Sequence, residues 1–288
     1  MFKGSYVATV TPFVNGKIDE KKFAELIEFQ IKNGTDGIVP VGCTGEAATM
    51  THDEQKVVMK FVCEVVKRRV PVVAGAGSNS TAEAVSLTKC AKKAGCDGVL
   101  SITPYYNKPT PEGQYRHYTS VARAADIPVM IYNVPSRTGI SVKPETVARL
   151  SQIDNIVAIK EASGSLDQVS QILSLSDITV LSGDDSLTLP MMSIGAKGVV
   201  SVVANIIPRE VHKMTDDFLK GDIKKARAAH YRMLPLCKAM FIETNPIPVK
   251  TAMQLFGRLN GEFRLPMCEM EKENEKKLKK VLKDYGIL

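Results

Sequence analysis

The sequence predicts an α/β protein built as a (β/α)₈ barrel with a small helical extension at its C-terminus. Short β-branched runs recur along the chain, stretches with apolar residues at helical spacing separate them, and polar residues collect where the runs end. Strands that alternate with helices form parallel sheets with right-handed crossovers. Eight such units in about 210 residues fit a barrel, since barrels of this kind have about 250 residues.

The expected barrel strands are eight apolar runs at residues 6–10, 37–41, 70–74, 98–102, 127–132, 156–160, 178–182 and 199–203. Amphipathic helices are expected between them, for example over 22–32, 53–67 and 81–94. Thr51, and Ser80 or Thr81, are candidate N-caps for two of these helices. The alternative is a doubly wound open sheet. That fold would need a glycine-rich nucleotide-binding loop after the first strand, and Val10-Thr11-Pro12-Phe13 does not provide one.

We expect the chain to divide near residue 221. Residues 1–221 hold the eight predicted units and would form the catalytic barrel. Residues 222–288 have a helical pattern interrupted by prolines, so we expect a small helical extension that packs on the barrel.

Composition is typical of a soluble globular protein, with 44% hydrophobic and 24% charged residues in 288. No stretch has the apolar length that a membrane-spanning helix needs, and the start carries no secretion signal. Six cysteines without a Cys-x-x-Cys pair indicate reduced thiols and a cytoplasmic location. The net charge of +7 is spread along the chain, which argues against a nucleic-acid partner.

Lys160 is the most informative residue, because it ends the apolar run 156–160. An ammonium at the mouth of a buried strand loses hydration, and its pKa falls. A neutral amine can attack a ketone, so Lys160 is a candidate for Schiff-base chemistry. The alternative is a lysine that extends from the sheet into solvent. Polar residues at the other strand ends favour the catalytic interpretation, since barrel enzymes build their active sites there.

Two further candidate residues lie at the end of the preceding predicted strand and in the segment after it. Tyr132 is a candidate to shuttle protons between imine intermediates; otherwise its ring only fills the top of the barrel. Arg137 offers a planar guanidinium to a substrate carboxylate. The alternative for Arg137 is a structural ion pair that braces the loop at Pro135.

The segment Gly42-Cys43-Thr44-Gly45-Glu46 follows the second predicted strand. Its hydroxyl and its backbone N–H groups at the start of a helix would hold a carboxylate. The alternative is a polar turn that leads to an N-cap. Gly183 follows another strand and is expected at the substrate site. Asp184-Asp185 beside it lacks further ligands at metal-site spacing, so we expect the pair to cap and brace loops, with no metal bound.

Together these segments resemble the dihydrodipicolinate synthase branch of the pyruvate-dependent lyase family, which also contains N-acetylneuraminate lyase. The resemblance rests on Gly42-Cys43-Thr44-Gly45-Glu46, Pro104-Tyr105-Tyr106-Asn107, the segment 132–139 and Ile159-Lys160-Glu161-Ala162, and it extends over essentially the whole chain. Tyr-Asn-x-Pro-x-Arg-Thr with a lysine one strand later is specific for the family. Arg137 favours the synthase over the sugar-acid lyases.

The resemblance implies a role for each site residue. Lys160 would be the Schiff-base lysine and Tyr132 the catalytic proton donor and acceptor. Thr44 and the backbone of Val200 would hold the carboxylate of pyruvate, and Arg137 that of the aldehyde substrate.

The resemblance also implies a proton relay between subunits. Tyr106 would be lent by a neighbouring subunit, which implies a homo-oligomer, most often a homotetramer made from two tight dimers. Cys43 stands where the relay usually has a threonine. A thiol is a weaker hydrogen-bond partner than a hydroxyl, so Cys43 brings relay efficiency into question.

The reaction implied is a Schiff-base condensation of pyruvate with L-aspartate 4-semialdehyde, a lyase step of diaminopimelate and lysine biosynthesis that needs no cofactor and no metal. The alternative on the same scaffold is an aldolase or lyase that acts on a sugar acid. A barrel that only binds a metabolite is disfavoured by the convergence of Lys160, Tyr132 and Arg137.

A candidate effector site for lysine is also implied by the resemblance. His52, Asn79, Glu83 and Tyr105 match residues that bind lysine at the dimer interface of inhibited relatives. Glu83 can pair with an ammonium, and Asn79 and Tyr105 can hydrogen-bond an amino-acid head group. Ala47 and Gln55 depart from the usual pocket. The alternative is that His52 and Glu83 are solvated residues of first helical turns.

Overall fold

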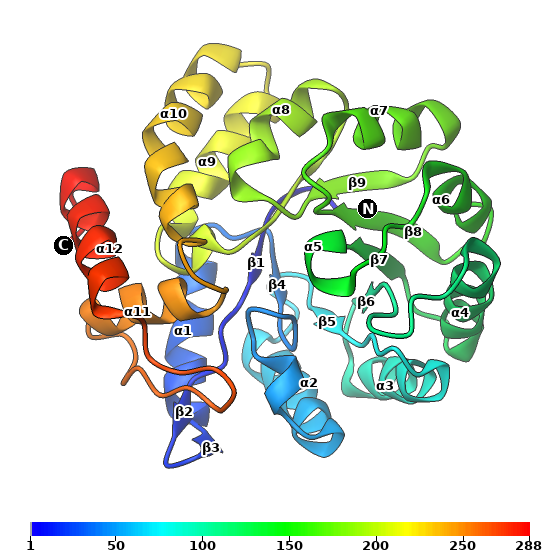
Figure 1. The fold of residues 1–288 in the computed structure, drawn as a ribbon, viewed down its shortest axis with the longest axis horizontal. Helices are drawn as coiled ribbons and strands as arrows, with labels where there is room; N and C mark the ends of the chain where they lie inside the picture. The colour runs from blue at the N-terminus through cyan, green and yellow to red at the C-terminus, as the bar shows by residue number, and fades with distance from the viewer. Residues whose placement is uncertain (1) are drawn as a thin grey trace.

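The computed structural model describes residues 2–288, in which eight parallel strands form a nearly closed barrel surrounded by helices (Figure 1). Neighbouring strands follow the order β4-β1-β10-β9-β8-β7-β6-β5. A β-bridge between Ile38, in β4, and Val72, just before β5, joins the first and last strands of this order. The N–H of Ile38 also donates to the carbonyl of Pro71 at 2.9 Å. The predicted (β/α)₈ fold is confirmed.

The barrel strands are β1 (Gly4–Ala8), β4 (Gly37–Val39), β5 (Val73–Gly75), β6 (Gly98–Ile102), β7 (Val129–Asn133), β8 (Ile156–Glu161), β9 (Thr179–Ser182) and β10 (Gly198–Ser201). The helices of the barrel are α1 (Glu20–Lys32), α2 (His52–Val66), α3 (Thr81–Ala94), α4 (Pro111–Ala124), α5 (Pro135–Thr138), α6 (Pro144–Leu150), α7 (Leu166–Leu175), α8 (Thr188–Ser193) and α9 (Pro208–Leu219). Three short 3₁₀ helices are η1 (Ala47–Thr49), η2 (Asp185–Leu187) and η3 (Val203–Asn205).

Several strand boundaries differ from the prediction. β1 covers residues 4–8 and not 6–10, and β5 covers 73–75 and not 70–74. β4 ends at Val39 because Val41 adopts a left-handed backbone with φ 60°, which turns the chain out of the sheet. A small hairpin of β2 (Phe13–Val14) and β3 (Lys17–Ile18) was not predicted, since its runs are too short to give a periodic signal.

Side chains alternate between the inside of the barrel and the surrounding helices. In β7, Met130 and Tyr132 belong to the inner cluster, whereas Val129 and Ile131 pack in the outer core against helices. β8 continues the pattern, with Ala158 in the inner cluster and Ile159 in the outer one. This period of two directs Lys160 inward and Glu161 outward.

Two helix starts agree with the predicted caps. The Thr51 hydroxyl accepts from the N–H of Glu54 at 3.2 Å, and the Glu54 carboxylate accepts from the N–H of Thr51 at 2.9 Å, so α2 opens with a capping box. At α3 the cap is Ser80, which accepts from the N–H of Glu83.

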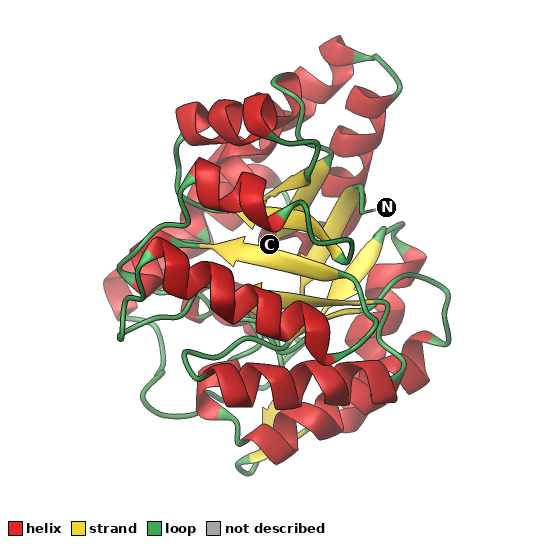
Figure 2. Ribbon diagram, turned by 90° about the vertical axis from the view of Figure 1, so that its right-hand side faces the viewer, coloured by secondary structure: helices red, strands yellow, loops and turns green. Residues whose placement is uncertain are grey.

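Three further helices, α10 (Ile223–Ala239), α11 (Ile247–Leu255) and α12 (Lys272–Tyr285), follow the barrel. α10 contacts α9 and α12, and α11 also contacts α12. Figure 1 shows them gathered at one side of the barrel, and Figure 2 shows the strands enclosed by helices. The division into a catalytic barrel (1–221) and a separate extension (222–288) stays a prediction.

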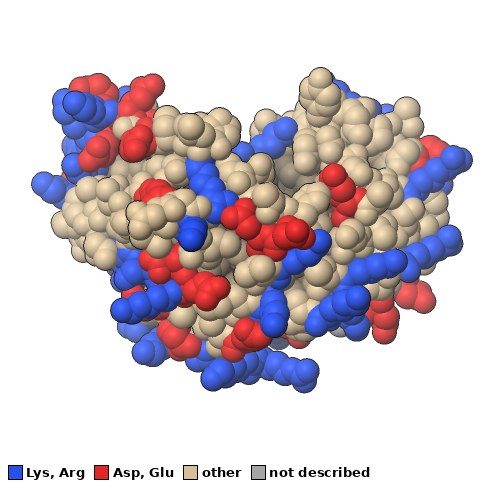
Figure 3. Space-filling view, turned by 90° about the horizontal axis from the view of Figure 1, so that it is seen from below, with Lys and Arg blue, Asp and Glu red and all other residues tan. Residues whose placement is uncertain are grey.

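Charged side chains of both signs are interspersed over the face seen in Figure 3. Within residues 2–288, several charged side chains pair within one helix, such as Lys220 with Asp216 at 2.7 Å and Lys276 with Glu273 at 2.8 Å. The six cysteines are free thiols. Among residues 2–288, no helix combines the length and the apolar character needed to cross a membrane.

Candidate active site

Lys160 lies inside the barrel near the carboxyl end of β8, and only 5% of it is exposed. It is the register partner of Tyr132 on β7, and its Nζ lies 4.3 Å from the centre of the tyrosine ring. Burial lowers the pKa of Lys160 from 10.5 to about 8; the Cys43 and Asp185 side chains oppose this shift. About a tenth of this amine is therefore neutral at pH 7, a much larger fraction than for an ordinary lysine.

A cavity of about 430 Å³ opens over Lys160. It collects side chains from several strand ends and from the segment before α11, and its lining includes Thr44, Tyr132, Arg137, Lys160, Gly183 and Asn245. A second cavity of about 310 Å³ shares Tyr132, Arg137 and Asn245 with the first and is also lined by Cys43. The predicted strand-end residues thus meet at one end of the barrel.

Thr44 is buried beside this cavity, and its hydroxyl accepts a hydrogen bond from Asn245 Nδ2 at 2.9 Å. The hydroxyl proton of Thr44 is then free to be donated to a ligand. Within residues 2–288 the N–H groups of Thr44 and Gly45 have no acceptor. Thr44 lines the cavity, whereas Gly45 lines neither cavity, so the hydroxyl and the N–H of Thr44 are available for an anion.

The helix that this segment enters is the short η1, whose N-cap is Glu46. η1 has three residues, and α2 begins only at His52. The turn itself is closed by the N–H of Glu46, which donates to the carbonyl of Cys43 at 3.1 Å, and by the N–H of Ala47, which donates to Gly42 at 3.2 Å. Turn geometry, and not the dipole of a long helix, orients the free N–H groups.

Arg137 lies in α5 on the exposed rim of both cavities. Its Nη2 donates to the carbonyl of Asn245 at 2.9 Å. No acidic partner within residues 2–288 pairs with it, so the alternative of a structural ion pair is not seen. The remaining N–H groups of the guanidinium can face a substrate carboxylate.

Asn245 was missed as a site residue in the sequence. It connects Thr44 to Arg137 through its side-chain amide and its carbonyl. The Asn-Pro-Ile-Pro segment that contains it is conspicuous, but only the folded chain brings it to the barrel.

Tyr132 is enclosed in the barrel, and 7% of it is exposed. Burial raises the pKa of Tyr132 well above its ordinary value, Cys43 acts in the same direction and Arg137 opposes it. The phenol is therefore protonated at neutral pH and can donate its proton. Cys43 is half-buried next to Thr44.

Gly183 provides space for Lys160. A Cβ atom at this position would lie 2.9 Å from Lys160 Cε and 2.7 Å from Ala162 Cβ.

Val200 is fully buried in the inner cluster with Tyr132, and Val202 lines the cavity in its place. The side chain of Val200 thus packs below the site.

Tyr106 lies outside both cavities, with 89% of its surface exposed and a left-handed backbone, φ 69°. One chain alone does not bring it to the reacting end of Lys160.

The Asp184-Asp185 pair has the expected bracing role: Asp184 accepts from the N–H of Ser186 at 2.9 Å, and Asp185 accepts from the N–H groups of Val202 and Val203 at 3.0 and 2.9 Å.

Part of the candidate effector site comes together between α2 and α3. His52 Nε2 lies 3.8 Å from Glu83 Oε2, and Glu83 accepts from the Ser78 hydroxyl at 2.6 Å. His52 and Tyr105 both line the second cavity. Asn79 does not line it; its carbonyl accepts from Asn107 Nδ2 at 2.9 Å.

No three His, Cys, Asp or Glu side chains are grouped as metal ligands would be within residues 2–288. The chemistry of the donors around Lys160, an amine, a phenol, hydroxyls and N–H groups, suits carboxylates and carbonyls better than a metal ion.

Residues 1–285 match the dihydrodipicolinate synthetase family. The chain belongs to this family. A 4-hydroxy-tetrahydrodipicolinate synthase of Geobacter sulfurreducens is 58% identical over 290 residues, with all of both chains covered. The crystal structure of a dihydrodipicolinate synthase from Aquifex aeolicus has 49% identity and a TM-score of 0.98, with 99% of each chain covered. A synthase from Cyanidioschyzon merolae with lysine bound has 41% identity and a TM-score of 0.96, covering 100% of this chain and 99% of that one.

Membership of the dihydrodipicolinate synthetase family confirms the predicted activity. The enzyme is a lyase of the class I aldolase type with 4-hydroxy-tetrahydrodipicolinate synthase activity, and it acts in lysine and diaminopimelate biosynthesis.

Proposed function

We propose that Lys160 forms a Schiff base with pyruvate in this cavity and that the resulting enamine condenses with L-aspartate 4-semialdehyde. The observation that best supports this proposal is that Lys160 is buried against the ring of Tyr132 and that its pKa is lowered to about 8. A neutral amine in a barrel mouth lined with anion-binding groups suits a substrate that carries a ketone next to a carboxylate.

The steps follow from the groups present. The Lys160 amine attacks the pyruvate ketone and water leaves, which gives a protonated imine. Loss of a methyl proton, relayed through Tyr132, gives the enamine, whose carbon attacks the aldehyde of the second substrate. The substrate amine then displaces Lys160 as the ring closes, and the free lysine is regenerated.

Each remaining residue takes one role in this scheme. Thr44 offers its hydroxyl and N–H to the carboxylate of pyruvate, with Val200 and Gly183 shaping the floor of the site. Arg137 receives the carboxylate of the aldehyde at the rim. Cys43 and Tyr106 complete the proton relay with Tyr132, and Tyr106 comes from a neighbouring subunit. Its 89% exposure on the single chain suits that role.

A sugar-acid lyase on the same scaffold would use an aldose as its acceptor. Arg137 at the rim favours a short aldehyde with its own carboxylate, because a guanidinium binds a carboxylate in a planar, bidentate manner. Parallel assays with aspartate semialdehyde and with N-acetylmannosamine separate the two substrates.

Borohydride reduction in the presence of pyruvate tests the Schiff base. Mass spectrometry is expected to find the reduced adduct on the peptide containing Lys160, and Lys160→Ala is expected to lose both adduct and turnover. Lys250 is an internal control, since it is also buried with a lowered pKa. An adduct on Lys250, or on no lysine, would contradict the assignment.

The relay requires an assembly of subunits. We infer a homotetramer made of two tight dimers, in which each tight dimer exchanges Tyr106, and we expect the enzyme in the cytoplasm, where lysine biosynthesis takes place. Neither a membrane nor a nucleic acid enters this scheme.

Lysine is the proposed effector at His52, Asn79, Glu83 and Tyr105. The carboxylate of Glu83 lies near His52 and could bind the ammonium of lysine, while Tyr105 borders the cavity that reaches Tyr132. Millimolar lysine is expected to lower the initial rate at fixed pyruvate, and Glu83→Ala to abolish the effect. If millimolar lysine changes the rate of neither the parent nor Glu83→Ala, these four residues are solvated side chains without an effector role.

A further inference from the structure

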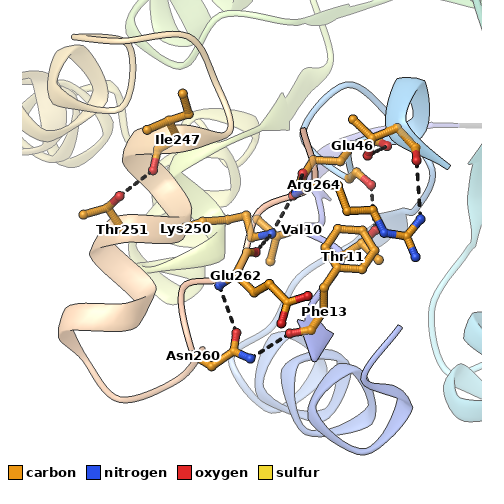
Figure 4. Close-up of polar contacts among 12 residues, drawn as sticks. Val10, Thr11, Phe13, Glu46, Ile247, Lys250, Thr251, Asn260, Glu262 and Arg264 are labelled. Atoms are coloured by element: carbon orange, nitrogen blue, oxygen red, sulfur yellow. Dashed lines mark hydrogen bonds and ion pairs between the residues drawn. The ribbon is translucent and has the colours of Figure 1, made fainter. Parts of the chain in front are cut away.

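A buried ion pair joins the loop that carries Thr44 to the C-terminal helices. Lys250 lies on α11, and its Nζ donates to Glu46 Oε1 at 2.5 Å and to the carbonyl of Glu262 at 2.6 Å. Both charged side chains are only 1% exposed. Figure 4 shows Lys250 reaching from α11 toward Glu46, with Phe13 and Glu262 beside it.

The surroundings of the pair are largely apolar. The rings of Phe13 and Phe263 lie 4.8 Å from Lys250 Nζ. The carboxylate of Glu262 is occupied by the N–H groups of Asn15 and Gly16, at 2.8 and 2.6 Å, and the side chain of Arg264 by Glu54 at 2.7 Å. The Lys250 ammonium and the Glu46 carboxylate therefore have each other as their charged partners.

Such a pair stabilises a fold little more than an apolar pair of the same volume would, because both charges lose their hydration. It does, however, fix where its two atoms lie.

Glu46 follows Thr44 closely in the same turn and has a left-handed backbone, with φ 54° and ψ 38°. This conformation is unfavourable for a residue other than glycine and persists only where contacts hold it. The side chain of Glu46 is held by the bond to Lys250 and by a weak one from the N–H of Arg264 to Glu46 Oε2 at 3.4 Å. Its backbone is held within the turn: the N–H donates to the carbonyl of Cys43 at 3.1 Å, and the carbonyl accepts from the N–H and the hydroxyl of Thr49, each at 3.0 Å.

Lys250 and Asn245 belong to one segment, as do Glu46 and Thr44. The segment before and within α11 thus holds the turn at two points: Asn245 binds the Thr44 hydroxyl at 2.9 Å, and Lys250 binds Glu46 at 2.5 Å. The same turn presents the hydroxyl and the free N–H of Thr44, which lines the cavity. A shift of Glu46 would move both groups together.

We infer that Lys250 and Glu46 are positioning residues that hold the Thr44 turn in the geometry that binds the carboxylate of pyruvate. The inference rests on the proposed function. It gives the C-terminal extension a specific part in substrate binding, although none of its lysines reacts with substrate.

The test is the double variant Glu46→Gln/Lys250→Met, which removes both charges at similar side-chain volume and leaves no unpaired buried ion. The pyruvate concentration for half-maximal borohydride trapping on Lys160 is expected to rise about 10-fold or more, because misplacement of binding groups by about 1 Å has large effects. The same rise is expected in the KM for pyruvate. Turnover at saturating pyruvate is expected to change less, since ground-state binding is what is lost.

The matched control is Glu54→Gln/Arg264→Met. This variant removes another ion pair between the C-terminal segment and the barrel, at 2.7 Å, without altering the Glu46 side chain. It is expected to lower the melting temperature and to keep the pyruvate dependence of the parent.

Parental pyruvate dependence in a folded double variant would overturn the inference, and an equal rise in the control would do the same. If the double variant does not fold, Glu46→Asp alone is measured, because it keeps the charge that pairs with Lys250 and shortens the side chain by one methylene. The turn must then move for the ion pair to form, so a rise of about 3-fold or more is expected, and an unchanged value overturns the inference. Absence of an adduct in the parent would instead contradict the proposed function.

Discussion

At the scale of the residue, two buried lysines of this enzyme have opposite surroundings. Lys160 has no carboxylate within ion-pair distance in residues 2–288, and burial lowers its pKa to about 8. Lys250 is paired with Glu46 at 2.5 Å, and the carboxylate opposes the effect of burial on its pKa. The missing counter-charge suits Lys160 to its proposed role as a nucleophile, whereas the counter-charge of Lys250 suits it to its proposed role as a positioning residue.

Replacement of the reactive lysine is expected to stabilise the fold. The pKa of Lys160 is about 8 when folded and 10.5 ordinarily, so its charge destabilises the folded state fully below about pH 8, and the effect fades as the pH rises toward 10.5. At about 1.4 kcal/mol per pKa unit, Lys160→Met should raise the free energy of unfolding at pH 7 by on the order of 3 kcal/mol. Urea unfolding at pH 7 and pH 10 measures this. A gain that persists at pH 10 would indicate better packing and not the removed charge.

Cys43 gives a second prediction at this scale. If its thiol takes part in the relay, Cys43→Thr should keep or raise turnover, because a hydroxyl is the better hydrogen-bond partner. Cys43→Ala should lower turnover on the order of 10²-fold. Steady-state rates of the parent, Cys43→Thr and Cys43→Ala test whether the thiol takes part in the relay. Equal rates would mean that Cys43 only packs against its neighbours.

At the scale of the element, the position of the lysine depends on the contact between β8 and β9. The strands pair in register, and Gly183 follows β9 directly beside the Lys160 side chain. A glycine is required here by close approach, since a Cβ would lie 2.9 Å from Lys160 Cε.

Gly183→Ala is therefore expected to displace Lys160 and to lower kcat/KM about 10-fold to 100-fold. It should also lower the melting temperature, because its Cβ would lie 2.7 Å from Ala162 Cβ. Ala162→Gly in the same chain removes that second contact and should restore the melting temperature but not the activity. Recovery of both would show that packing alone had been disturbed.

At the scale of the whole molecule, the active site draws on parts of the chain that are far apart in sequence. Asn245 and Thr44 are separated by 201 positions, and Lys250 and Glu46 by 204. The C-terminal segment thus contacts the turn that carries the proposed carboxylate site, and in the proposed assembly Tyr106 would reach the active site of a neighbouring subunit.

Mixing two variants tests the shared site. Tyr106→Phe is expected to lower turnover while leaving imine trapping on Lys160 intact, and Lys160→Ala alone is expected to be inactive. Reassembled mixtures should regain activity, because a mixed dimer contains one site with Lys160 from one subunit and Tyr106 from the other. Activity no greater than that of the separate variants, in mixtures shown by native mass spectrometry to be mixed, would contradict the exchange of Tyr106.

The sequence by itself determined the barrel, because strand and helix periodicities are local and their alternation restricts the topology. It also brought Lys160, Tyr132, Thr44 and Arg137 to one end, since parallel strands end on the same side. Only the tertiary structure decided how these groups are held. Val41 ends β4 through a left-handed backbone that its β-branched side chain does not favour. The bonds of Asn245 and Lys250 to the Thr44 turn depend on the path of a distant segment, which no local pattern encodes.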